Sequence, residues 1–258
     1  MSGLDLEGFD SWLVALGQSP QTRRLKGHYV RRFMATADPL TCDQMPIIKF
    51  LAKDNWKPQT RSAAYNCLHS LFEWLVTTKQ RDESPMKDMK PPKVPRSVPK
   101  PCPEDKLEAA LKVANPKAQL ILLLGAYAGL RREEIASLHT DNILLEAGKL
   151  RITGKGSKTR LIPIADRLLP VLQGLEPGWV FPNGRGGHVT GTTVGRMARK
   201  SLGTHSTHSL RHRFATQVHQ KSRDLRAVQA LMGHSSLAIT EMYLQVTDDD
   251  MVNAVGTL

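Results

Sequence analysis

The stretch SPMKDMKPPKVPRSVPKPCP, residues 84–103, is dense in proline and lysine and has almost no apolar pattern. Proline-rich composition stiffens a chain into an extended linker. An ordinary surface loop is the alternative, but the length and basic charge of the stretch favour the linker. A chain of 258 residues is long enough for two domains, one on each side of this stretch. We therefore predict one domain at residues 1–82, a linker at 83–103 and a larger domain at 104–258.

The charge balance favours a polyanionic partner. The formal net charge is +12 and the pI is about 9.8, and neutralising phosphates releases condensed counterions. Nucleic acid or an anionic membrane surface would fit. The longest uncharged apolar stretch, Leu120 to Leu130, is shorter than the roughly 20 residues that span a bilayer. The N-terminal stretch MSGLDLEGFD carries acids where a secretory signal carries lysine or arginine, so we expect a cytoplasmic protein.

The three cysteines indicate neither a disulfide framework nor a thiolate zinc site. They are odd in number and contain no CxxC pair. We expect buried free thiols at Cys42, Cys67 and Cys102.

Helical periodicity and start signals predict a bundle of about four helices in the first domain. The predicted helices are LEGFDSWLVAL, QTRRLKGHYVRRFMATA, CDQMPIIKFLAKD and QTRSAAYNCLHSLFEWLVTT. Basic residues near the helix starts or on polar faces are candidate phosphate contacts, although most residues of this kind are only solvated. These candidates are Arg23, Arg24, Arg31, Lys57 and Arg61.

The second domain is predicted to be mainly helical with a small antiparallel sheet. Helices are expected at about residues 104–114, 117–138, 165–175, 190–201, 208–221, 224–232 and 237–246. Between the second and third of these, KLRIT and TRLIPI alternate like strands on either side of the stretch GKGSK, residues 154–158. This pattern predicts a β-hairpin with a basic, glycine-bearing tip.

Two stretches of the second domain carry cations that suit a phosphate. In GLRREEI, Arg131 and Glu134 form either a solvated helix end or a pair in which the acid holds a partner while the arginine reaches a phosphate. The tip GKGSKT resembles a P-loop in composition, but its spacing and its strand–strand flanks do not fit one. A cationic finger is the alternative to a solvated turn, with Lys155 or Lys158 delivering a proton or touching a phosphate. Arg160 is a further candidate DNA contact.

The stretch THSTHSLRHRFATQVHQ allows two interpretations. Its histidines at positions 205, 208 and 212 recur at helical spacings of three and four, so one face could present imidazoles to zinc. No acidic or cysteine ligand lies nearby in the sequence. Alternatively, His208 and Arg211 form a proton-transfer group beside a phosphate clamp. Arginine suits the clamp because its planar fork pairs two phosphoryl oxygens and keeps its charge.

Tyr243 follows His234 by nine residues in GHSSLAITEMYLQV. A lone tyrosine usually fills space and forms a hydrogen bond through its hydroxyl. A free phenol has a pKa of about 10, so a tyrosine nucleophile needs positive surroundings and a base. Two arginines, a lysine and two histidines would supply them.

With these residues in order, the sequence resembles the tyrosine recombinases, that is, phage-type integrases and their Xer, Cre and Flp relatives. GLRREEI resembles the first arginine box, GKGSKTRLIPI the lysine hairpin, HSLRHRFAT the H-x-x-R box and LMGHSSLAITEMY the tyrosine box. Any one box is weak, but all of them together, in order and properly spaced, are specific. The resemblance covers nearly the whole chain. It implies a helical, SAM-like core-binding domain and a catalytic domain that form a C-shaped clamp on DNA.

The resemblance also implies the chemistry. Tyr243 would attack a DNA phosphate and leave a 3′-phosphotyrosyl link and a free 5′-hydroxyl, without metal or ATP. Glu134 would be the acidic neighbour of the first arginine. Arg131 and Arg211, with His234, would stabilise the pentacoordinate transition state. Lys155 would protonate the departing oxygen. His208 would accept or hold the nucleophile's proton.

The same resemblance implies a monomer in solution and a tetramer on two double-stranded core-type sites, which would exchange strands through a Holliday junction. The tail TDDDMVNAVGTL would dock on a neighbouring protomer, or else fray. Because the core-binding pattern begins almost at Leu4, we expect a simple integrase without an arm-binding module, of the kind carried by actinobacteriophages. It would need only short core-type sites.

Four other functions compete with this one. A Xer-like resolvase of chromosome or plasmid dimers would differ in locus context or in dependence on a partner recombinase. A type IB topoisomerase would relax supercoils without strand exchange, and a regulator with a degenerate site would bind DNA without cutting it. A zinc hydrolase built on the three histidines would lose its activity in EDTA.

Overall fold

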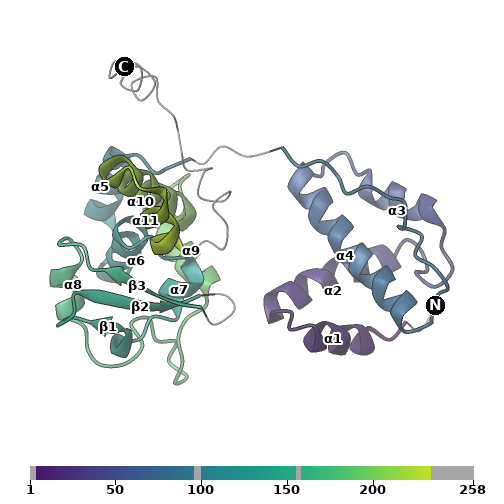
Figure 1. Ribbon diagram of the computed structural model, residues 1–258, viewed down its shortest axis with the longest axis horizontal. Helices are drawn as coiled ribbons and strands as arrows, with labels where there is room; N and C mark the ends of the chain where they lie inside the picture. The colour runs from purple at the N-terminus through teal and green to yellow at the C-terminus, as the bar shows by residue number, and fades with distance from the viewer. Residues whose placement is uncertain (1–3, 96–99, 155–157, 234–258) are drawn as a thin grey trace, which may run out of the picture. The chain divides into compact units, whose positions relative to one another are not determined.

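The computed structural model of the chain describes residues 4–95, 100–154 and 158–233 (Figure 1). The chain divides into two compact units, Met1–Ser97 and Val98–Leu258. Each unit has a hydrophobic core of its own. In these described ranges, no helix is both long enough and apolar enough to cross a membrane.

The N-terminal unit contains the four predicted helices. They are α1 (Leu6–Ala15), α2 (Pro20–Met34), α3 (Gln44–Leu51) and α4 (Pro58–Thr77). The side chains of Asp5, Ser19 and Asp43 accept hydrogen bonds from the first turns of α1, α2 and α3, which satisfies backbone donors that a helix start leaves unpaired. Pro20 and Pro58 open α2 and α4 because proline has no backbone donor to lose there.

The core of the N-terminal unit is aromatic and extends into the predicted linker. Phe33 packs edge to face against Phe50, with ring centroids 5.4 Å apart. Met86 is buried in the same core, and the hydroxyl of Tyr65 donates a hydrogen bond to the carbonyl of Met89. The first part of the predicted linker therefore packs on the N-terminal unit. At its other end, Cys102 is buried in the core of the C-terminal unit.

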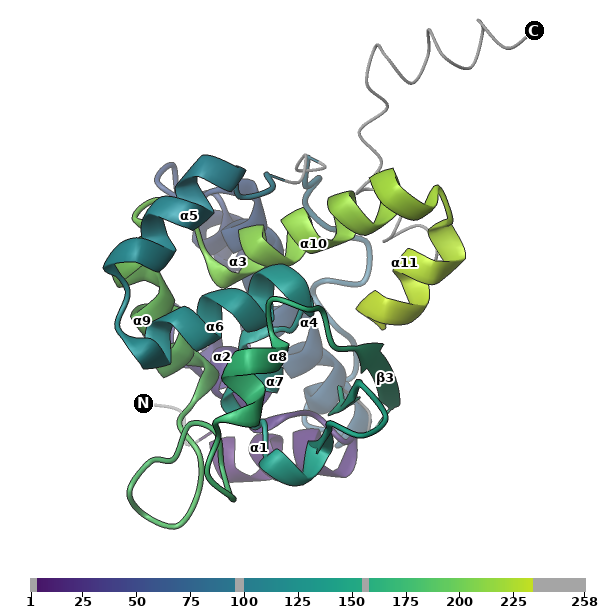
Figure 2. The ribbon, with the colours of Figure 1, turned by 90° about the vertical axis from the view of Figure 1, so that its left-hand side faces the viewer.

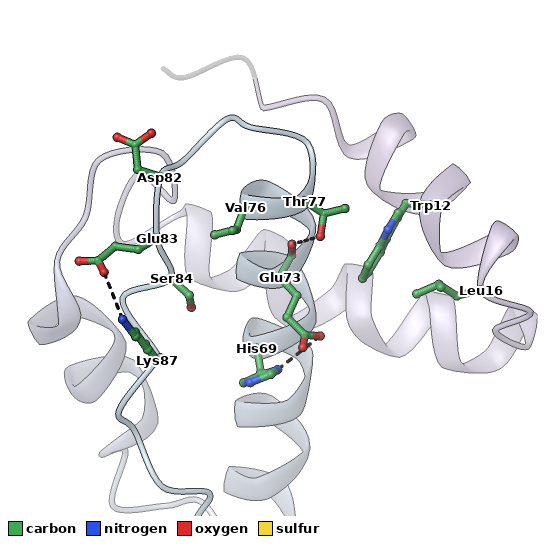
Figure 3. Close-up of a pocket in the computed structure, with 10 residues that line it drawn as sticks. All are labelled: Trp12, Leu16, His69, Glu73, Val76, Thr77, Asp82, Glu83, Ser84 and Lys87. Atoms are coloured by element: carbon green, nitrogen blue, oxygen red, sulfur yellow. Dashed lines mark hydrogen bonds and ion pairs between the residues drawn. The ribbon is translucent and has the colours of Figure 1, made fainter.

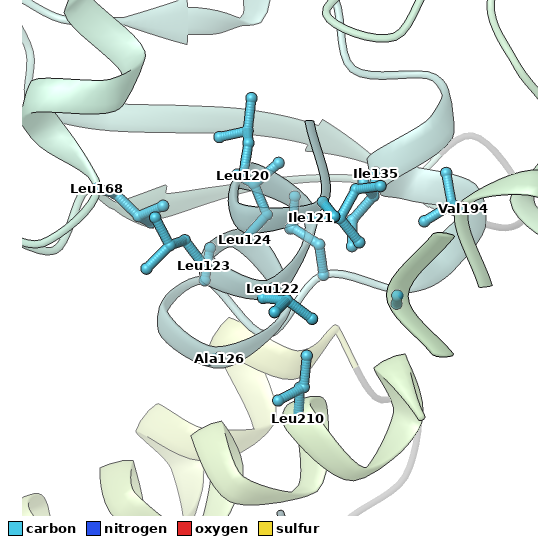
Figure 4. Packing of buried hydrophobic residues seen from close by; sticks show 14 of the residues in the cluster. Leu120, Ile121, Leu122, Leu123, Leu124, Ala126, Ile135, Leu168, Val194 and Leu210 are labelled. Atoms are coloured by element: carbon cyan, nitrogen blue, oxygen red, sulfur yellow. The ribbon is translucent and has the colours of Figure 1, made fainter. Parts of the chain in front are cut away.

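The C-terminal unit is built around one apolar helix (Figure 4). Its helices are α5 (Glu104–Val113), α6 (Pro116–Tyr127), α7 (Arg132–Ala136), α8 (Leu169–Gln173), α9 (Gly191–Leu202), α10 (Thr207–Ser222) and α11 (Leu225–Met232), with a 3₁₀ turn at Thr140–Asn142. Helix α6 is apolar on every side and is buried between its neighbours. A Cβ atom on Gly125 would lie 3.1 Å from Leu210, so α6 and α10 approach closely. Helices α10 and α11 lie side by side (Figure 2).

The predicted β-hairpin is confirmed. Strands β2 (Lys149–Thr153) and β3 (Thr159–Pro163) pair in antiparallel fashion, with Ile152 opposite Arg160. A third strand, β1 (Ile143–Leu144), pairs with β2 and gives the order β1-β2-β3. Two residues are too few to produce an alternating pattern, so the sequence did not indicate β1.

The prediction of a single helix at residues 117–138 is wrong, because one helix ends at Tyr127 and another begins at Arg132. Gly129 has a φ of +62°, and a Cβ atom there would lie 2.4 Å from Cδ1 of Phe214. Arg131 is extended (φ −73°, ψ 152°) and is the N-cap residue of α7. A left-handed residue followed by an extended one cannot continue a helix. The break therefore places Arg131 and Glu134 at the start of a helix. The helix predicted at residues 237–246 lies outside the described residues.

Candidate functional site

The centre of the site is the buried carboxylate of Glu134, in the first turn of α7. Its Oε2 accepts a hydrogen bond from the backbone N–H of Arg131 at 2.8 Å, and its Oε1 accepts one from Nη1 of Arg131 at 2.9 Å. Arg160 of β3 donates to both carboxylate oxygens, from Nη1 at 2.9 Å and from Nη2 at 2.8 Å. This carboxylate therefore joins the start of α7 to the sheet.

The carboxylate of Glu134 is ionised over the whole physiological range. Burial alone would raise the pKa of Glu134. The hydrogen bonds and positive charge of Arg160 outweigh that effect, with help from the Arg131 backbone and the charge of Arg211, and lower the pKa to about 2. Since three guanidinium groups face one carboxylate, the cluster carries net positive charge and attracts anions.

The two arginines of the predicted boxes lie at this same carboxylate. The side chain of Arg131 is 42% exposed. Nη1 of Arg211 lies 4.0 Å from Oε2 of Glu134, and the Arg211 side chain is 2% exposed. Arg211 also donates hydrogen bonds to the carbonyls of Gly129 and Met232. The fold thus gathers Arg131 and Arg211, which are distant in sequence, around one acid, with Arg131 facing solvent.

Helix α10 presents the candidate proton acceptor one turn before Arg211. His208 lies in the first turn of α10, where Ser206 forms a capping box with Ser209. Partial burial of the ring lowers the pKa of His208, and the charges of Arg211 and Arg131 lower it further. A neutral imidazole can accept a proton, which is the property that the predicted role of His208 requires.

His212 lies behind His208 on α10. The two rings meet edge to face with centroids 4.1 Å apart. Burial lowers the pKa of His212, and the charges of His208 and Arg211 lower it further, to about 4. Among the described residues, which include His205, no group of three or more histidine, cysteine, aspartate or glutamate residues is arranged to hold a metal ion.

Two of the predicted cations of the hairpin differ in their exposure to solvent. Lys158 is exposed. The side chain of Arg160 is only 11% exposed. Each of its guanidinium nitrogens donates to a protein oxygen: Nη1 and Nη2 to the carboxylate of Glu134, and Nε to the carbonyl of Leu231 at 2.8 Å. We therefore interpret Arg160 as a structural partner of Glu134 and not as a DNA contact. Three predicted catalytic residues lie outside the described residues: Lys155, His234 and Tyr243.

Three of the predicted DNA contacts of the N-terminal unit share one hollow. It has a volume of about 260 Å³, lies between α1 and α2, and is lined in part by Arg23, Arg24 and Arg31. Arg23 forms an ion pair with Asp10, with Nη1 and Oδ2 3.3 Å apart. Arg24 and Arg31 are exposed and keep their place as candidate phosphate contacts.

The other two predicted contacts lie at the start of α4. Lys57 is exposed at the N-cap position. Arg61 donates to the carbonyls of Leu51 and Lys53 at 2.8 and 3.1 Å. It thus satisfies carbonyls at and just beyond the end of α3, which gives it a structural role.

A larger pocket of the N-terminal unit has the wrong charge for DNA. It has a volume of about 540 Å³, and Trp12 of α1 forms part of its apolar wall (Figure 3). Glu73, Asp82 and Glu83 line it as well. Because carboxylates repel phosphate, we do not assign this pocket to the nucleic-acid interface.

The sequence interpretation did not include Glu133, and it named Arg160 only as a candidate DNA contact. Oε2 of Glu133 accepts the backbone N–H of Gly191 at 3.1 Å, which ties α7 to the start of α9. Arg160 carried a usable signal: it is two residues from Ile162, so strand alternation places both on the buried face. The contact of Glu133 with α9 gave no local signal.

Known proteins resemble this chain over nearly its whole length. The sequence model of one family, described as "Phage integrase family", matches residues 102–250. The chain is 29% identical to tyrosine recombinase XerA of Thermococcus kodakarensis, over 96% of this chain and 93% of that protein. The solved structure of the integrase from mycobacterium phage Brujita is 30% identical and aligns with a TM-score of 0.52, over 97% of this chain and 90% of that one.

The fold has a further counterpart among solved structures. A lambda integrase dimer bound to a COC′ core site aligns with a TM-score of 0.72 over 92% of this chain and 75% of that one. At 17% identity, this is a likeness of fold alone. It bears out the predicted class, mainly helical with a small antiparallel sheet.

Proposed function

The chain belongs to the phage integrase family and is a tyrosine recombinase, and from this premise we propose that it is a site-specific recombinase of the phage-integrase type. The observation that carries the proposal is the meeting of Arg131 and Arg211 at the buried carboxylate of Glu134. A positive cluster with one arginine facing solvent suits a phosphate whose charge grows in the transition state.

In the proposed reaction, the hydroxyl oxygen of Tyr243 attacks a backbone phosphorus, and the bond from phosphorus to the 5′-oxygen breaks. A 3′-phosphotyrosyl link and a free 5′-hydroxyl result. His208 accepts or holds the proton of the nucleophile, and Lys155 protonates the departing oxygen. The phosphodiester energy is kept in the new bond, so a 5′-hydroxyl from a partner duplex can reverse the step.

The arginines have a different task. Arg131 and Arg211, with His234, bind the non-bridging oxygens and stabilise charge in the pentacoordinate transition state. Arg211 donates to the Met232 carbonyl in the DNA-free chain.

The proposed substrate is double-stranded DNA that carries short core-type sites. Four protomers would act on two sites and exchange strands through a Holliday junction, and the chain would be a monomer when free. Arg24, Arg31 and Lys57, which are exposed on the N-terminal unit, would contact the DNA backbone. The tail TDDDMVNAVGTL, residues 247–258, would dock on a neighbouring protomer; it lies outside the described residues.

A Xer-type dimer resolvase is the second candidate. The similarity to XerA supports it, since it extends over nearly the full length of both chains. The similarity to the Brujita integrase supports the first candidate to about the same degree. The two functions differ in their DNA sites, because a resolvase joins two copies of one site and an integrase joins two different ones.

Covalent trapping tests the proposal. The protein is incubated in EDTA with nicked duplexes that contain random sequence, and Tyr243→Phe is run in parallel. We expect a covalent DNA adduct that maps to Tyr243 and is absent from the Phe variant. Sequencing the attached DNA then gives the site, and recombination between identical or different sites separates resolvase from integrase. DNA binding without an adduct, on a pool that retains the bound sites, would favour a regulator.

A further inference from the structure

Arg160 lies on the inward face of β3 although it is charged. It pairs with the buried Ile152 of β2, and its own side chain is 11% exposed. A buried guanidinium needs partners for its N–H groups, because leaving them unpaired costs their desolvation free energy. The identity of those partners therefore indicates what the residue does.

The partners of Arg160 come from elements that are distant in sequence. Its two terminal nitrogens bind the two oxygens of Glu134, the two-pronged geometry that arginine forms with a carboxylate. Its Nε binds the carbonyl of Leu231 at 2.8 Å, in the last turn of α11, where helical carbonyls have no partner within the helix. One planar group thus joins the start of α7 to the end of α11.

The start of α7 carries Arg131, and the end of α11 leads in sequence into the tyrosine box. Glu134 fixes the backbone and the side chain of Arg131. Helix α11 ends at Met232, and Gly233 follows in the left-handed conformation with a φ of 60°. A Cβ atom on Gly233 would lie 3.1 Å from Cδ of Arg160, so the chain passes directly against the arginine stem just before the tyrosine box continues.

We propose that Arg160 is a positioning residue for strand transfer, whose guanidinium fixes the turn that carries Arg131 relative to the end of α11. It acts through Glu134 and Leu231 and does not contact DNA. This inference rests on the proposed function.

Two substitutions separate the geometry of Arg160 from its charge. Arg160→Lys keeps a positive charge, but an ammonium group lacks the planar fork that reaches both carboxylate oxygens and the Leu231 carbonyl together. Arg160→Gln removes the charge as well. Lys158→Gln is the matched control, since Lys158 is exposed on the same hairpin.

The first measurement is the single-turnover rate of adduct formation at several pH values, on the DNA site recovered by trapping, with DNA affinity in parallel. We expect both Arg160 variants to bind DNA like the wild type and to form adduct about 10²-fold more slowly, since a small misplacement of a catalytic group has an effect of this size. The Lys variant should keep the wild-type pH profile. The Gln variant should lose further rate at acidic pH, because Glu134 then protonates more readily.

A wild-type adduct rate in either Arg160 variant would overturn the inference. An equal loss of affinity and rate would do so too, since that result marks a DNA contact.

Amide hydrogen exchange in the DNA-free protein is the second measurement. The amide of Arg131 donates to Glu134, and the amide of Gly233 closes the last turn of α11. We expect both amides to exchange faster in Arg160→Lys and to be unchanged in Lys158→Gln. Unchanged exchange in Arg160→Lys would refute the link between the two elements. Absence of an adduct in the wild type would instead refute the proposed function, and the exchange result would still test Arg160.

Discussion

Glu134 shows how an acid can be buried and still remain ionised. Removing an ionised carboxylate from water is unfavourable unless hydrogen bonds and opposite charge compensate. Here Arg131 and Arg160 supply the hydrogen bonds, and Arg211 adds charge at 4.0 Å. The carboxylate in turn keeps like-charged guanidinium groups together, as the proposed phosphate site requires.

Replacing Glu134 by Gln should destabilise the protein in a pH-dependent way. The pKa of Glu134 is lowered to about 2 in the folded chain, so the ionised form stabilises the fold above the unfolded pKa of about 4.3. The free energy of unfolding of the wild type should exceed that of the variant by about 3 kcal/mol at neutral pH. This difference should vanish as the pH falls from about 4.5 to about 2. Urea unfolding followed by circular dichroism at several pH values measures this. Glu146→Gln, at an exposed site, is the control, and a difference independent of pH would contradict the prediction.

The break between α6 and α7 depends on one glycine, and a second glycine provides its control. Gly129 and Gly148 have nearly equal φ angles, +62° and +61°, but a Cβ atom on Gly129 would lie 2.4 Å from Phe214, whereas one on Gly148 would meet nothing within 4 Å. Gly148→Ala should therefore lower the free energy of unfolding only through backbone strain, by about 1 kcal/mol. Gly129→Ala should lower it by about 1–3 kcal/mol more, because the added methyl group overpacks against Phe214. Thermal unfolding compares them, and equal losses would show that the contact with Phe214 does not matter.

Local chemistry predicts the elements of this fold better than their ends and their contacts. The hairpin could be predicted because Leu150, Ile152 and Ile162 alternate with exposed neighbours. The helix starts at Ser19 and Asp43 follow from capping chemistry. The apolar pattern did not indicate the break at Gly129, since it continues through that position. The lack of room for a Cβ atom there depends on Phe214, which is far along the chain.

The candidate site likewise contains residues that the sequence predicted and one whose role depends on long-range contacts. Spacing and resemblance predicted Arg131, Glu134, His208 and Arg211. The fold brings the two arginines to the carboxylate of Glu134. The role of Arg160 depends on two long-range contacts, with Glu134 and with Leu231. The sequence shows such contacts only as an alternation of buried and exposed positions. A charged residue on the buried face of a strand is therefore a signal that deserves the same weight as a motif.

At the scale of the whole molecule, the main hydrophobic cores of the two units are separate among the described residues, and we expect two separable unfolding transitions. Leu71 is fully buried in the core of the N-terminal unit, and Ile121 is fully buried in that of the C-terminal unit. Truncating either side chain to Ala should lower the free energy of unfolding of its unit by about 2–5 kcal/mol. Each substitution should lower the melting temperature of its own unit and leave that of the other unchanged, because each core buries its apolar surface within its own unit. Differential scanning calorimetry of the two full-length variants measures both transitions. A single transition lowered by both substitutions would mean that the two cores unfold as one cooperative unit. The proposed DNA contacts on one unit would then be coupled to the stability of the arginine cluster on the other.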